Sequence, residues 1–167
     1  MKSIITNTSP IIGLSVIGQL PLLWQLFDRV YVPQAVISEL TNSLHENDYG
    51  RKEVVAALDN QKIIQYHVQD ELLVQRLYGK LHKGELEVII GGKELNTDFV
   101  LIDEKAARTM AKNFFLTPIG ILGILRIAKS QGKIEEIKPY LDMLISNEYR
   151  ISKSLYEQVL TLENEWV

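Results

Sequence analysis

Short apolar runs alternate with longer amphipathic stretches along most of this chain. The runs at residues 4–6, 30–32, 63–66, 99–102 and 115–118 have the length and composition of β-strands. The run at 99–102 is apolar throughout, which is typical of a central strand that is buried on both faces. Because stretches with helical spacing separate the runs, the pattern predicts an α/β domain around a mostly parallel sheet.

Helices are predicted in the segments between these runs. Ser9-Pro10 is a good helix start, because serine can cap free amides and proline is tolerated in the first turn. Further helices are expected at 34–44, 51–58, 71–81, 85–95, 104–113 and 121–129. After Gly132 the sequence predicts two more helices, 134–145 and 152–165, and no strand. We therefore expect a single domain, 1–167, whose last part (about 35 residues) is a helical C-terminal extension.

The composition narrows the classes of protein. With 46% hydrophobic and 23% charged residues, the chain has an ordinary globular profile. It has no cysteine, which excludes disulfides and thiolate metal sites. No run approaches the roughly 20 apolar residues of a membrane span, and no secretory signal is recognisable, so a cytoplasmic protein with no membrane contact is expected. The net charge of −3 does not exclude nucleic-acid binding, because acids gathered round a metal add to the negative count.

Carboxylate or amide side chains recur where the predicted strands give way to helices. Asn7 follows the first strand and Asp103 follows the run at 99–102, while Glu39 and Glu85 lie in adjoining helices. In a parallel sheet such positions line the crevice at the carboxyl ends of the strands, where ligands bind. Oxygen ligands without cysteine indicate Mg²⁺ or Mn²⁺. Glu87 is a weaker candidate, because it points to a different side of the helix from Glu85.

Each of these side chains also has a purely structural interpretation. Asp103 can cap the helix that follows it. Glu85 lies in a first helical turn, where the helix dipole favours a carboxylate. Glu39 can be an exposed helix residue, and Asn7 can stabilise a turn through its side chain. The recurrence of acids at the strand ends of one predicted sheet favours a shared site over four separate structural roles.

Seven short motifs run in order over nearly the whole chain and carry a resemblance to a known family. They are Asn7-Thr8-Ser9-Pro10-Ile11-Ile12, Val32-Pro33-Gln34-Ala35-Val36, Gly50-Arg51, Gly84-Glu85-Leu86-Glu87, Leu101-Ile102-Asp103-Glu104-Lys105-Ala106-Ala107-Arg108, Ile119-Gly120-Ile121-Leu122-Gly123 and Tyr149-Arg150-Ile151-Ser152. As an ordered set they resemble PIN-domain proteins, and more narrowly the branch labelled DUF3368, which is described as predicted nucleic-acid-binding.

The resemblance implies a three-layer α/β/α fold and a metal-dependent ribonuclease that uses Mg²⁺ or Mn²⁺. Carried over by position, the acids of the family fall at Asn7, Glu39, Glu85 and Asp103. Asp103 would be the main metal ligand, and Glu39 and Glu85 would complete the cluster or orient water. PIN nucleases usually have an aspartate where this chain has Asn7, whose uncharged amide binds a cation more weakly. A non-catalytic PIN-like module that binds RNA or a partner protein therefore stays open as an alternative.

Four residues are candidates to contact an RNA substrate: Ser9, Arg51, Lys105 and Arg108. Ser9 could equally cap the first helix, and the basic side chains could equally belong to solvated helix faces. The resemblance further implies that the protein could be the toxin of a toxin–antitoxin pair, with a small antitoxin protein as its partner. A homodimer is expected, because two-fold dimers are the commonest assembly.

Overall fold

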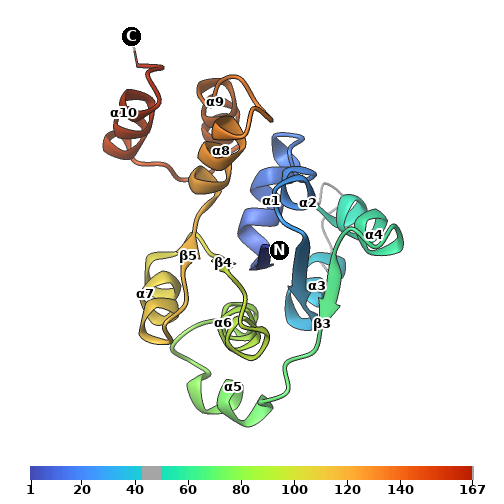
Figure 1. The fold of residues 1–167 in the computed structure, drawn as a ribbon. Helices are drawn as coiled ribbons and strands as arrows, with labels where there is room; N and C mark the ends of the chain where they lie inside the picture. The colour runs from blue at the N-terminus through green and yellow to red at the C-terminus, as the bar shows by residue number, and fades with distance from the viewer. Residues whose placement is uncertain (43–49, 167) are drawn as a thin grey trace.

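A five-stranded, all-parallel sheet forms the centre of the computed structural model, which describes residues 1–42 and 50–166 (Figure 1). The spatial order of the strands is β3-β2-β1-β4-β5. Their bounds are Ser3–Thr6 (β1), Arg29–Pro33 (β2), Ile64–Tyr66 (β3), Phe99–Leu101 (β4) and Pro118–Ile119 (β5). The predicted α/β class with a parallel sheet is confirmed.

The last strand lies further along the chain than the apolar run at 115–118 predicted. Residues 114–116 close the end of the preceding helix instead: the Leu116 amide donates to Ala111 O, and Phe115 adopts a left-handed φ of 61°. Pairing with β4 begins at Thr117, whose carbonyl accepts from the Val100 amide. Residues 115 and 116, which the apolar pattern predicted to begin a strand, therefore belong to the turn that ends the preceding helix.

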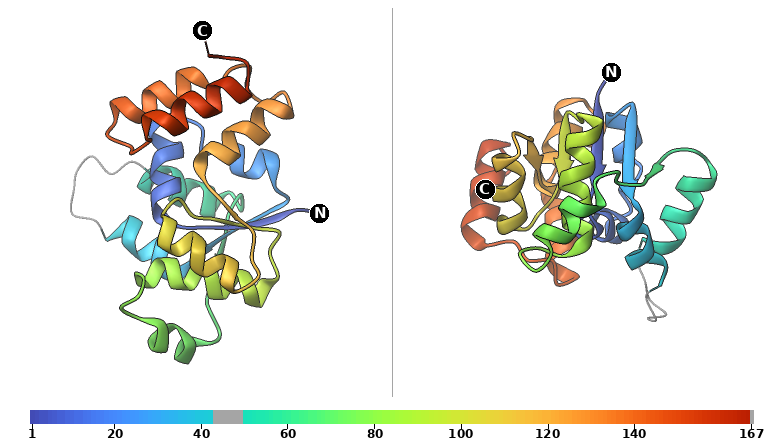
Figure 2. Two further views of the ribbon diagram at one scale, coloured as in Figure 1. Left: turned by 90° about the vertical axis from the view of Figure 1, so that its left-hand side faces the viewer. Right: turned by 90° about the horizontal axis from the view of Figure 1, so that it is seen from below.

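Helices cover both faces of the sheet (Figures 1 and 2). One face carries α1 (Thr8–Val16), α2 (Leu22–Leu26) and α8 (Ile121–Ser130), and the other carries α6 (Lys83–Leu95) and α7 (Lys105–Asn113). The helix α3 (Gln34–Thr41) packs against both α1 and α6, while α4 (Arg51–Asp59) packs against α3 and α5 (Glu71–Leu77) packs against α6. The last two positions of the helix predicted at 34–44 lie outside the described residues.

The central helix α6 approaches the sheet closely because two glycines face it. A β-carbon on Gly92 would lie 2.7 Å from Val100 Cγ1, and one on Gly91 would lie 2.8 Å from Ile5 Cδ1. Val100 and Ile5 are fully buried on neighbouring strands. Side-chain-free positions therefore let the helix backbone rest on β1 and β4, which fixes where the first turn of α6 lies relative to the strand ends.

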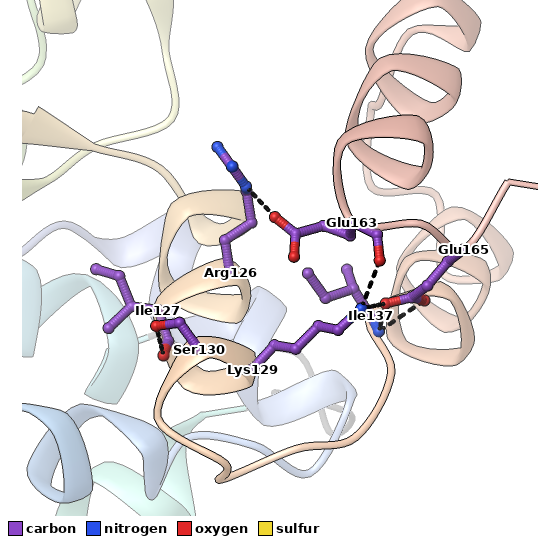
Figure 3. Close-up of polar contacts among 7 residues, drawn as sticks. All are labelled: Arg126, Ile127, Lys129, Ser130, Ile137, Glu163 and Glu165. Carbon is purple, nitrogen blue, oxygen red and sulfur yellow. Dashed lines mark hydrogen bonds and ion pairs between the residues drawn. The ribbon is translucent and has the colours of Figure 1, made fainter.

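The C-terminal helices α9 (Lys138–Ser146) and α10 (Lys153–Leu162) pack beside α8 and α1. The Glu165 carboxylate, which follows α10, accepts from the Ile137 amide at 2.8 Å and forms an ion pair with Lys129 of α8 (Figure 3). It also accepts from the Lys138 amide at 2.7 Å. The helix predicted at 134–145 thus begins only at Lys138, where Pro139 occupies the first turn and Glu165 supplies the acceptor. None of the helices in the described residues has the length and apolar character needed to cross a membrane.

Candidate active site

Polar side chains from five segments gather around a cleft at the carboxyl ends of the strands. This cleft, which we call the acid cleft, has a volume of about 450 Å³. The parallel strands β1 and β4 end here: Thr6 pairs with Leu101, and Asn7 and Glu104, which follow these two strands, line the cleft. The residues that line it are Asn7, Thr8, Ser9, Glu39, Tyr78, His82, Lys83, Glu85 and Glu104.

Asn7 enters the acid cleft from the end of β1. Its main-chain amide donates to Leu101 O at 3.1 Å, which continues the pairing of β1 with β4 by one residue. Although Asn7 is the N-cap of α1, its side chain makes no capping hydrogen bond. Ser9 lies one residue inside the helix and lines the cleft, so it is not the cap that the sequence suggested. The side-chain amide of Asn7 therefore lies at the cleft wall and does not cap the helix; the residue is 6% exposed.

Glu39 reaches the acid cleft from α3. Its Oε2 accepts a hydrogen bond from the Thr8 hydroxyl at 2.6 Å, which joins α3 to the first turn of α1. Its other oxygen lies over Gly84, because a β-carbon there would come within 2.7 Å of Glu39 Oε1. The small residue before Glu85 therefore lets the two glutamates approach from different helices.

Glu85 is a buried carboxylate in the first turn of α6, with an exposed fraction of 4%. It accepts a hydrogen bond from the His82 amide at 3.0 Å and so forms the capping box that begins the helix. Burial raises the pKa of Glu85 above its ordinary value; the His82 amide opposes this effect, and the neighbouring Glu104 carboxyl adds to it. Two carboxyl groups of like charge are thus held side by side at the cleft.

Asp103, the expected main ligand, lies beside the acid cleft but is not among the described residues that line it. One carboxylate oxygen accepts from the Ile121 amide at 3.0 Å, at the start of α8, and the other accepts from the Tyr149 hydroxyl. Burial raises the pKa of Asp103, and the hydrogen bonds from Tyr149 and Ile121 and the nearby Arg108 charge oppose the rise. The next residue, Glu104, lines the cleft.

The remaining sequence candidates lie outside the acid cleft. Glu87 points toward α3, where it accepts from the Ala35 amide at 2.8 Å. Arg108 donates through Nη1 to Ile102 O at 3.1 Å, so its head supports the end of β4. Arg51 and Lys105 are exposed first residues of α4 and α7 and do not line the cleft. Of the four residues expected to contact RNA, only Ser9 belongs to its wall.

The donor set of the acid cleft fits a hard divalent cation. Glu39, Glu85, Glu104 and the Asn7 amide offer only oxygen ligands, as Mg²⁺ and Mn²⁺ prefer. As they stand, no three Asp, Glu, His or Cys side chains in the described part of the chain are close enough to share an ion. Ionised Glu85 and Glu104 repel each other, and a cation between them would remove that repulsion.

Gly84→Ala is expected to weaken the binding of Mn²⁺ in the acid cleft by about 10- to 100-fold without unfolding the protein. The new β-carbon would displace the carboxylate of Glu39, the movable end of a flexible side chain, so the cost falls on the position of that ligand. Calorimetric titration with Mn²⁺ and a thermal melt measure the two effects. In a Glu39→Gln background the same change should have little further effect; an equal loss in both backgrounds would show that Glu39 is not involved.

Open α/β sheets bind ligands at the carboxyl ends of their strands, and the carboxylates around this cleft are ligands suited to a divalent cation. The family model for the PIN domain DUF3368 matches residues 3–165, and the chain therefore belongs to the PIN-domain family. This is a family of nuclease-type modules that interact with nucleic acid and typically use divalent metals. No curated protein matches the chain.

Proposed function

We propose that the protein is a metal-dependent ribonuclease whose reaction takes place in the acid cleft. The observation that carries the proposal is the pair of carboxyl groups of Glu85 and Glu104, which stand together at the cleft although burial and like charge raise the pKa of Glu85. The capping box of α6 uses Glu85 alone, so it does not require the second carboxyl group beside it. Carboxyl groups in a cleft whose pKa is raised by burial and by a neighbouring carboxyl group are typical of functional sites.

Four side chains of the acid cleft would hold Mg²⁺ or Mn²⁺ in this proposal: Asn7, Glu39, Glu85 and Glu104. When bound, the cation would lower the pKa of water and offset charge on the phosphate and the leaving oxygen. Thr8 orients Glu39, and the His82 amide orients Glu85. Asp103 holds the β4 end against α8 and thereby orients Glu104. Lys83, in the first turn of α6, offers a positive charge and a helix N-terminus to phosphate.

The test is cleavage of a fluorescently labelled single-stranded RNA by the purified chain with Mn²⁺ or Mg²⁺, with and without chelator. The proposal expects cleavage that the chelator abolishes. Glu104→Gln should lose more activity than Asp103→Asn, because Glu104 lines the cleft, whereas the Asp103 carboxylate accepts hydrogen bonds from Ile121 and Tyr149. RNA binding that persists in chelator, with no cleavage under any metal, would instead establish the non-catalytic binding module.

Asn7→Asp is expected to tighten Mn²⁺ binding and to raise the rate of cleavage. The change adds a ligand charge at the cleft wall, where hard cations gain affinity from each carboxylate. Without metal the added carboxylate should repel Glu85 and Glu104, so the variant should melt at a lower temperature in chelator and recover in Mn²⁺. Calorimetry and thermal melts measure both effects. Asn7→Ala, which removes the oxygen and adds no charge, should weaken Mn²⁺ binding; equal affinity in all three proteins would contradict the ligand role of Asn7.

We also propose that the ribonuclease is the toxin of a toxin–antitoxin pair and that it forms a homodimer. Both proposals are based on the chain's membership of the PIN-domain family and not on the geometry of the acid cleft. The toxin role is tested by inducing the protein in a bacterial host: growth should stop, and a small protein from the same operon should restore it. The homodimer is tested by light scattering of the purified chain, which gives its mass in solution.

A further inference from the structure

A second hollow adjoins the acid cleft on the side of the turn between α5 and α6. Its volume is about 400 Å³, and Tyr78, His82, Glu85 and Glu104 line both hollows. The wall that belongs to the second hollow alone includes Gly79 and Lys80 from the turn and Ala106 from α7. The two hollows together therefore form a path that leads from the carboxylates to the turn.

Tyr78 stands where the two hollows meet. It is the C-cap of α5 in an extended conformation, and 68% of its surface is exposed. Next to it, Gly79 adopts a left-handed φ of 96° and would have nothing within 4 Å of a β-carbon. The turn thus presents a large, rigid aromatic side chain beside open space, at the rim of a cleft that is otherwise polar.

Two lysines flank this aromatic side chain. Lys80 lines the second hollow and Lys83 lines the acid cleft, and both are exposed. Cations spaced along a groove, together with an exposed aromatic ring, are how proteins hold single-stranded nucleic acid: the ring stacks on a base and the cations contact the backbone phosphates. A base in a duplex is already stacked and paired, so such a ring favours an unpaired strand.

We propose that the turn formed by residues 78–81 is a nucleobase subsite, in which Tyr78 stacks on one unpaired base of an RNA strand. Lys80 and Lys83 contact the phosphates on either side of that nucleotide. The next phosphate along the strand then lies in the acid cleft. This inference rests on the proposed ribonuclease function and adds the residue that places the strand.

Binding is tested separately from cleavage, by fluorescence anisotropy of labelled decauridylate in chelator at low salt. Tyr78→Ala is expected to weaken binding by about 5- to 150-fold, which is the fold-change for ~1–3 kcal/mol of one stacked base. Tyr78→Phe should bind nearly as the wild type, because the ring remains. Phe115→Ala, which removes an aromatic ring that is 90% exposed elsewhere on the surface, is the matched control and should have no effect.

An abasic oligonucleotide of the same length separates stacking from charge. The wild type should bind it more weakly than decauridylate, and Tyr78→Ala should change its affinity little. Equal losses on both strands, no loss with Tyr78→Ala, or no binding by the wild type would overturn the subsite. A parallel assay of cleavage in Mn²⁺ distinguishes the two proposals: Tyr78-dependent binding without cleavage overturns the nuclease and supports the subsite, whereas cleavage with Tyr78-independent binding overturns the subsite alone.

Discussion

Glu85→Gln should lower RNA cleavage by about 10²–10³-fold, the scale of losing one charge-stabilising group at a reacting centre. The same change should raise the stability of the metal-free protein. Glutamine can still accept the hydrogen bond from the His82 amide, so the start of α6 is kept. It carries no charge into the buried position beside Glu104, so the cost of ionising Glu85 there disappears.

The stabilisation expected for Glu85→Gln should depend on pH, and the direction of that dependence follows from the raised pKa of Glu85. The pKa of Glu85 is raised in the folded protein, so the folded state holds its proton to a higher pH than the unfolded state does. Stability therefore falls as the pH rises from the unfolded pKa through the folded one. The metal-free wild type should melt higher in mild acid than near neutral pH, and Glu85→Gln should lessen that dependence. Near neutral pH, Mn²⁺ should stabilise the wild type more than it stabilises Glu85→Gln.

Glu53→Gln is the matched control for this prediction. Glu53 closes a similar capping box at the start of α4, where it accepts from the Gly50 amide at 3.2 Å, but it is exposed and lies outside the acid cleft. Its replacement should change neither cleavage nor the response to Mn²⁺. Full activity of Glu85→Gln together with a lower melting temperature would contradict the site and leave Glu85 with the capping role alone.

Tyr149→Phe should lower the free energy of unfolding by ~1–3 kcal/mol near neutral pH. The change removes the hydroxyl that donates to the carboxylate of Asp103 and leaves that buried group with one partner fewer. Because burial already raises the pKa of Asp103, and the Tyr149 hydrogen bond opposes the rise, the variant should raise it further. The destabilisation belongs to the ionised carboxylate, so it should be largest above that pKa and shrink as the pH falls through it.

Urea unfolding near neutral pH and in mild acid measures this second effect. Tyr156→Phe serves as the control, since it removes another tyrosine-to-aspartate hydrogen bond, to Asp142 at 2.6 Å, at the exposed surface. That loss should stay below about 0.5 kcal/mol. If both variants lost the same free energy, or if the loss for Tyr149→Phe did not change with pH, the buried carboxylate would not be its cause.

The architecture follows from local pattern to a large extent. Four apolar runs coincide with β1 to β4. For the inner strands β1, β2 and β4 this follows because a buried parallel strand needs little more than a few consecutive apolar residues between helical segments, while β3 is a largely exposed edge strand. The fifth strand is misplaced, because the C-terminal turn of α7 competes for the same apolar residues and takes Phe114 to Leu116. A pattern of apolar residues does not distinguish a strand from a turn whose side chains pack on the core.

The candidate site is less accessible to sequence reasoning. The side chains of Asn7, Glu39 and Glu85 line one cleft because the carboxyl ends of parallel strands all lie at the same end of the sheet. The pair Asp103-Glu104 offers two acids after the same strand, and the pattern alone does not say which of them faces the cleft. In the structure, the hydroxyl of Tyr149, which is 46 residues away in sequence and lies between α9 and α10, donates to Asp103, and Glu104 lines the cleft. Such a contact depends on tertiary packing and leaves no local signal.

The hydrogen bonds to the Glu165 carboxylate allow local detachment of the C-terminal segment to be distinguished from unfolding of the whole domain. The amides of Ile137 and Lys138 belong to the first turn of α9, where no helix carbonyl is available to them, and a side chain 28 residues further along the chain accepts from the Ile137 amide. In a deuterium-exchange experiment these amides should therefore exchange whenever the segment after α10 detaches, even while the sheet stays closed. Their exchange rates report on the docking of the last residues alone, and those of the buried β1 and β4 amides report on the opening of the domain.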